Sequence, residues 1–163
     1  MSQAWKPERV STTSDALALE WYAGDTIVAY VLSDMSAKVL QDWSDAALDV
    51  LKNWSFGKPY LALYDLAHAG VVITYLGLVQ KKMFSLGITQ AGEAQALANI
   101  AQRKDFSARV ALCASMRHSG HVGGLLATID ARKTRSGQAV QYDVFYAREA
   151  ALNWLNKAQT QMP

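Results

Sequence analysis

The chain has 163 residues, of which 51% are hydrophobic and 18% charged, and this composition favours one compact domain over two. The net charge of +2 is small and the basic residues are scattered in short clusters, so we expect no nucleic-acid partner. A single cysteine excludes an internal disulfide, and no apolar run reaches the roughly 18 to 20 residues that cross a bilayer. The first residues also lack the apolar core of a signal peptide, so we expect a cytoplasmic protein without membrane insertion.

The first 33 residues predict a polar tail followed by a β-hairpin. Residues 1–14 are rich in Ser, Thr and charged side chains, and we expect them to form a flexible tail that precedes a single domain over residues 15–163. Alternating and β-branched residues then predict strands at 16–22 and 26–33, with the turn Ala23-Gly24-Asp25 between them.

A long amphipathic helix and a buried strand follow the hairpin. Ser36 is a suitable N-cap, and apolar side chains recur at helical spacing over residues 39–54, before Gly57 ends the pattern. The stretch "YLALYD", residues 60–65, is apolar on both faces, which is typical of a central parallel strand. Asp65 lies at the carboxyl end of this strand.

The remainder of the chain predicts alternating helices and strands. Helices are expected at residues 70–86, 89–102, 119–132 and 147–159, and strands at 108–115 and 139–146. The side chains expected to face inward from the last helix are Ala147, Ala151, Trp154, Leu155 and Ala158. The element order ββαβααβαβα predicts an α/β sandwich with a five-stranded, mostly parallel mixed sheet, in which the hairpin supplies one antiparallel edge.

Polar residues after two of these strands are the candidate ligand-binding residues, because ligands of open α/β sheets bind outside the carboxyl ends of the strands. The candidates are Asp65, His68, Ser115, Arg117, His118, Ser119, Gly120 and His121. A glycine-rich helix start beside Arg117 suits a phosphate or carboxylate. The alternative that we favour is structural: Ser119 caps the helix and the glycines allow close packing.

No pattern in the chain identifies a reaction. The three histidines and Asp65 would suit zinc, but His118 and His121 lack the glutamate of the helical zinc-protease motif and no cysteine pair is present, so we predict no metal. There is no G-x-S-x-G nucleophile elbow, and Cys113 lies in an apolar strand pattern that indicates burial. We therefore expect no catalytic residues, no cofactor and no enzymatic activity.

The second helix carries a candidate interaction surface. Its members are Tyr75, Leu78, Val79, Lys82 and Met83. If they cluster on one exposed face, they form a patch suited to a protein partner or to a second copy of the chain in a homodimer.

Several of these features occur together in one known family. The leading hairpin, the long helix, the strand ending in Asp65 and the closing sequence "VFYAREAALNWL" at residues 144–155 follow one another in this order. Together they resemble the STAS domain of anti-sigma-factor antagonists in its SpoIIAA-like form, which closes with a strand and "REEALAWL". The resemblance covers about residues 16–157. It implies a module that docks on a partner protein and is switched by phosphorylation of a hydroxyl residue after the central strand.

The phosphorylation motif of that family is incomplete in this chain. The usual run is Asp-Ser-Ser/Thr-Gly-Leu-Gly, whereas residues 64–78 read "YDLAHAGVVITYLGL". Thr74 is the one candidate phosphosite near the required position, and a helix N-cap or core threonine is the favoured alternative. We therefore predict a non-enzymatic interaction module without a clear phosphoswitch serine. Small-ligand or anion binding at the carboxyl ends of the strands is the alternative function.

Overall fold

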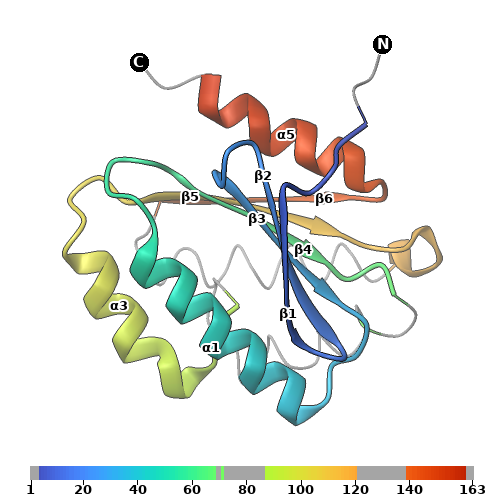
Figure 1. The fold of residues 1–163 in the computed structure, drawn as a ribbon, viewed down its shortest axis with the longest axis horizontal. Helices are drawn as coiled ribbons and strands as arrows, with labels where there is room; N and C mark the ends of the chain where they lie inside the picture. The colour runs from blue at the N-terminus through green and yellow to red at the C-terminus, as the bar shows by residue number, and fades with distance from the viewer. Residues whose placement is uncertain (1–3, 69–70, 72–86, 121–138, 161–163) are drawn as a thin grey trace.

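Six strands form one mixed sheet, and their order across the sheet is their order along the chain (Figure 1). The computed structural model describes residues 4–68, 71, 87–120 and 139–160. The strands are β1 (Arg9–Ser14), β2 (Leu17–Tyr22), β3 (Ile27–Leu32), β4 (Tyr60–Asp65), β5 (Ser107–Cys113) and β6 (Ala139–Phe145). The helices are α1 (Ala37–Asn53), α3 (Glu93–Ala101) and α5 (Arg148–Thr160), with short 3-10 turns η1 (Gln90–Gly92) and η2 (Met116–His118).

The sheet is antiparallel at one side and parallel over the rest. β1, β2 and β3 pair antiparallel, whereas β3, β4, β5 and β6 pair parallel. The predicted hairpin is confirmed as β2 and β3, and the predicted central strand is β4, which lies between two parallel neighbours. The α/β class is therefore confirmed.

The expected number of five strands is wrong, because residues 9–14 form β1 at the edge of the sheet. We expected these residues to belong to the polar tail. Five of the six residues of β1 are exposed, so the strand has no apolar face that would create an alternating pattern. Its backbone pairing with β2, from Arg9 opposite Trp21 to Ser14 opposite Leu17, holds it in the sheet.

Helices cover both faces of the sheet (Figure 1). α1 and α3 pack on one face, where Trp43, Tyr30 and Tyr64 are among the fully buried side chains. α5 packs on the other face, against apolar side chains such as Leu61 and Leu63 of β4. None of the helices in the described ranges is long and apolar enough to cross a membrane.

The boundaries of α1 and α5 follow local signals. The Ser36 hydroxyl accepts a hydrogen bond from the Val39 N–H at 3.3 Å, so the predicted N-cap of α1 is confirmed. On α5, the expected inward positions Ala151, Leu155 and Ala158 are buried and Trp154 is half-buried. Ala147 is exposed, contrary to expectation, because it precedes the first residue of the helix, and Leu152 is buried instead.

Two predicted helices lie largely outside the described residues. These are the helices expected at 70–86 and 119–132, and with the first of them lie Thr74 and the interaction surface Tyr75, Leu78, Val79, Lys82 and Met83. The helix expected at 89–102 is observed as η1 followed by α3.

Candidate functional site

The carboxyl ends of the parallel strands bring residues from distant parts of the chain to one edge of the sheet. The register places Asp65 of β4 opposite Cys113 of β5, and Cys113 opposite Phe145 of β6. The pairing continues past the strands, because the Leu66 N–H donates to the Cys113 carbonyl at 2.8 Å. α5 begins at Arg148, three residues after β6 ends, so this arginine starts its helix at the same edge.

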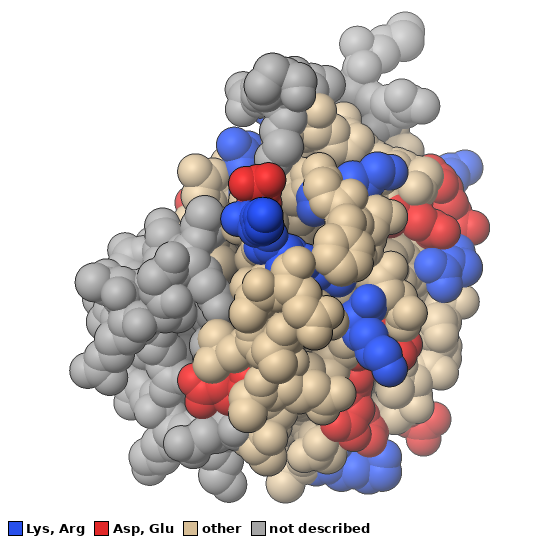
Figure 2. Space-filling model, turned by 90° about the vertical axis from the view of Figure 1, so that its left-hand side faces the viewer, with Lys and Arg blue, Asp and Glu red and all other residues tan. Residues whose placement is uncertain are grey.

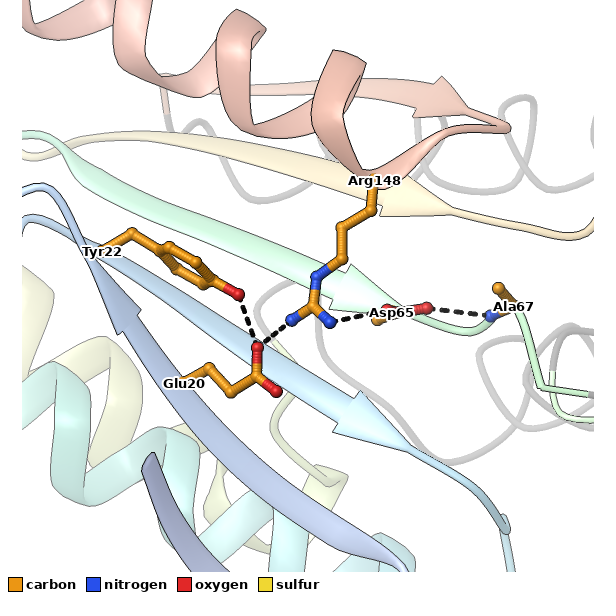
Figure 3. Close-up of polar contacts among 5 residues, drawn as sticks. All are labelled: Glu20, Tyr22, Asp65, Ala67 and Arg148. Atoms are coloured by element: carbon orange, nitrogen blue, oxygen red, sulfur yellow. Dashed lines mark hydrogen bonds and ion pairs between the residues drawn. The ribbon is translucent and has the colours of Figure 1, made fainter. Parts of the chain in front are cut away.

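Four polar side chains meet there, and we call them the strand-end cluster: Glu20, Tyr22, Asp65 and Arg148 (Figure 3). The Arg148 guanidinium lies between two carboxylates, with Nη2 on Glu20 Oε2 and Nη1 at 3.6 Å from Asp65 Oδ2. The Tyr22 hydroxyl donates to Glu20 Oε2 at 2.5 Å, and the other oxygen of Asp65 accepts from the Ala67 N–H at 3.2 Å.

The cluster is held away from bulk water on the α5 face of the sheet. The side chains of Glu20 and Asp65 are 17% and 14% exposed, and that of Arg148 is 33% exposed, so solvent screens their attraction less than at an open surface. A cation in the first turn of a helix opposes the helix dipole. We infer that Arg148 is stabilised at this position by its ion pairs with the carboxylates of Glu20 and Asp65, which offset its unfavourable interaction with the helix dipole.

Burial also strengthens the preference of two ionisable groups, one in the cluster and one beside it, for their neutral forms. Burial and the hydrogen bond to Glu20 raise the pKa of the Tyr22 hydroxyl well above its usual range. Burial raises the pKa of the Cys113 thiol to about 11, with a further increase from Asp65 and an opposing effect of Arg148. Neither group is ionised near neutral pH, so neither is poised as a nucleophile or a general base.

The buried thiol gives a testable pH dependence. Because the pKa of Cys113 is raised from its ordinary value of 9.0 to about 11 by folding, its contribution to stability is complete below pH 9 and is lost as the pH rises through about 11. We expect this loss to reach about 1–2 kcal/mol in the free energy of unfolding. Urea unfolding at pH 8 to 11 should therefore show a shallower alkaline decline in Cys113→Ala than in the wild type. Equal declines in the two proteins would contradict a raised pKa of the Cys113 thiol in the folded state.

The predicted site residues do not form a single site in the described part of the chain. Asp65 is directed to Arg148 and Ala67, while His68 and Arg117 are exposed. Ser115 accepts a hydrogen bond from the Arg117 N–H at 3.3 Å and so stabilises the short turn η2. Ser119 and Gly120 are exposed, His121 lies outside the described residues, and only the backbone of His118 is described.

The described residues also contain no cluster of three or more His, Cys, Asp or Glu side chains arranged to hold a metal. The residues that do converge, Glu20, Tyr22 and Arg148, were not predicted as site residues. One signal was available for each charged member: Glu20 interrupts the apolar run "ALALEWY", and Arg148 begins the closing "REAALNWL" sequence. Neither signal identifies the partner, because Glu20 and Arg148 are 128 positions apart.

Two large apolar side chains are exposed at this same edge. Met116 follows β5 and is 64% exposed, and Tyr146 follows the neighbouring β6 and is 41% exposed. Exposed apolar side chains on adjacent strand ends, next to an internally paired polar cluster, are suited to contact with another protein surface.

No family model, no curated protein and no solved structure matches the chain.

Proposed function

We propose that the protein is a non-enzymatic, STAS/SpoIIAA-like interaction module that docks on a protein partner. The observation that carries this proposal is the strand-end cluster. It joins three of the four features on which the resemblance rests: the leading hairpin through Glu20, the strand ending in Asp65, and the closing sequence through Arg148. One contact, the bridge of Arg148 to the two carboxylates, therefore explains why features so far apart in the sequence occur together.

The chemistry of the cluster favours docking over catalysis. The carboxylates of Glu20 and Asp65 are bound to Arg148, and the Cys113 thiol stays protonated near neutral pH. Group transfer requires an available nucleophile or a proton acceptor. Met116 and Tyr146 are exposed apolar side chains at this edge, and they supply contact area of the kind that dominates protein interfaces.

The proposal is tested by comparing three forms of the full chain as bait in an extract of the source organism, with captured proteins quantified by mass spectrometry. The forms are the wild type, the double variant Met116→Ser with Tyr146→Ser, and the control Val10→Ser, which alters an exposed apolar residue on β1. We expect one protein to be enriched by the wild type and the control, and to fall at least fivefold with the double variant. Equal recovery by all three forms would contradict docking at this edge.

The surface Tyr75, Leu78, Val79, Lys82 and Met83 belongs to the same proposal, whereas phosphorylation of Thr74 does not, because a helix N-cap or core role is favoured there. Charge reversal of Lys81 and Lys82 together with Tyr75→Ala tests this surface. Unchanged association with the partner, and unchanged self-association in analytical ultracentrifugation, would remove it from the proposal.

Anion or small-ligand binding at the strand ends is the competing function, with Arg117 as its exposed cation. Inorganic phosphate that raises the melting temperature saturably in the wild type, and not in Arg117→Gln, would favour that function over docking.

A further inference from the structure

A cleft of about 700 Å³ opens on the α1 side of the sheet, between the β2–β3 turn, the end of α1 and the loop before β4, whereas the strand-end cluster lies on the α5 side. Its volume lies in the range of small-molecule binding sites, which is about 300–1,000 Å³. The loop between α1 and β4 lies at the left of Figure 1, on the side that faces the viewer in Figure 2. Basic and acidic side chains are interspersed on the described part of that surface.

Two stacked tryptophans form an aromatic wall of the cleft. The rings of Trp21 and Trp54 are 6.1 Å apart between centroids and 22° apart in plane. Trp54 is buried, and its indole N–H donates to the Pro59 carbonyl at 3.0 Å. This wall is therefore fixed by the fold before any ligand binds.

The side chain of Arg9 occupies the aromatic wall as a ligand cation would. Its guanidinium carbon lies 4.4 Å from the centroid of the Trp21 ring, and its Nη2 lies 3.4 Å from Asp25 Oδ1. An aromatic face combined with a carboxylate is the arrangement by which proteins recognise organic cations. The niche is thus complementary to a guanidinium or an alkylammonium group.

The contact of Arg9 is weak enough to be exchanged. The side chains of Arg9 and Asp25 are 52% and 55% exposed, and ion pairs of such exposure contribute little to stability. Arg9 also belongs to the edge strand β1, which pairs with β2 alone among the described strands. Withdrawal of this side chain leaves the tryptophan wall and the rest of the cleft in place.

The charge that remains after such a withdrawal favours a cation. The charged residues that line the cleft are Arg9, Asp25, Asp49 and Lys58. Without Arg9, two carboxylates face one ammonium group, so the local charge is −1. The Asn53 amide donates to the Asp49 carboxylate at 3.2 Å and orients this second acceptor.

We propose that this cleft binds an organic cation, a guanidinium or alkylammonium compound with an aliphatic portion, and that Arg9 is the internal occupant which the ligand displaces. The ligand cation stacks on Trp21 and pairs with Asp25, while its aliphatic portion extends into the remaining cleft volume toward Asp49. This site is separate from the strand-end cluster, so its failure would leave the proposed docking function untouched.

Agmatine, which carries both a guanidinium and an ammonium group on an aliphatic chain, is the probe. Isothermal titration calorimetry should show saturable binding to the wild type and about fivefold tighter binding to Arg9→Ala, because the probe no longer competes with Arg9. Asp25→Asn in the Arg9→Ala background should weaken binding about tenfold. Asparagine suits the positive φ of 59° at position 25, so this substitution preserves the turn. Arg117→Ala, an exposed arginine at the opposite edge, should bind like the wild type.

Three outcomes would overturn the proposal. One is the absence of saturable agmatine binding to a folded Arg9→Ala protein, with folding checked by circular dichroism. Another is weaker binding to Arg9→Ala than to the wild type. The last is binding of inorganic phosphate that Arg9→Ala abolishes, since this would make the cleft an anion site that uses Arg9 as its cation.

Discussion

Replacing Arg148 by methionine is expected to destabilise the protein by about 2–3 kcal/mol near neutral pH. Methionine retains an aliphatic stem, so the change removes mainly the guanidinium. The carboxylates of Glu20 and Asp65, which are 17% and 14% exposed, then remain close to one another without the cation that bridges them. The free energy of unfolding in urea measures the effect, and an unchanged m-value would show that the native and unfolded ensembles are otherwise the same.

A surface ion pair provides the matched control. Lys38 pairs with Asp42 at 2.6 Å one helical turn away on α1, and its side chain is 78% exposed. Lys38→Met should cost no more than about 0.5 kcal/mol. Equally small losses in the two variants would mean that the strand-end cluster is only another screened surface contact.

A second substitution separates the charges from the packing. If uncompensated carboxylates cause the loss in Arg148→Met, then adding Glu20→Gln should recover part of it, and the double-mutant cycle should show coupling between positions 20 and 148. Additive effects would instead assign the loss to packing of the arginine stem. The result bears on function, because the proposed function is argued from the contact between the hairpin and the closing helix.

Elements with a continuous buried face are the part of this fold that could be predicted from local pattern. The strands β2 to β6 and helix α1 were predicted within two residues of their observed ends. β4 was predicted most closely, since all five residues from Tyr60 to Tyr64 are buried and produce an unbroken apolar run. In each case the apolar side chains whose spacing predicts the element are also the side chains that it buries in the core.

The features that escaped prediction depend on contacts that side-chain polarity along the chain does not reveal. β1 is exposed at five of six positions and is held by backbone pairing, which leaves no trace in side-chain polarity. The bridge from Arg148 to Glu20 joins the two ends of the chain. The cleft combines Trp21 of the hairpin with Trp54 beyond α1, and neither spacing nor composition shows that these two rings stack. Asp65 was predicted at a strand end because the neighbouring sequence shows where the strand ends. Its partner Arg148 was not predicted, because the neighbouring sequence does not show which distant residue lies beside it.

Replacing Gly87 by alanine is expected to cost about 3 kcal/mol, the second large effect that the structure predicts. A Cβ atom at this position would lie 3.0 Å from both Cε2 and Nε1 of Trp43. The Trp43 ring is fully buried and packs edge-on against Tyr64, with centroids 5.0 Å apart. Because neighbouring rings hold this indole on other sides, it cannot move away without disturbing the core.

Gly24→Ala is the control that separates the collision from backbone strain. Both glycines have a positive φ, 66° at Gly24 and 77° at Gly87, so alanine is strained at each by about 1 kcal/mol. A Cβ at Gly24 meets nothing within 4 Å, whereas one at Gly87 meets Trp43. The difference between the two free energies of unfolding therefore measures the collision alone, at about 2 kcal/mol. Equal losses would show that the core around Trp43 yields to an added methyl group, which would contradict the tight aromatic packing that supports the α1 face of the sheet.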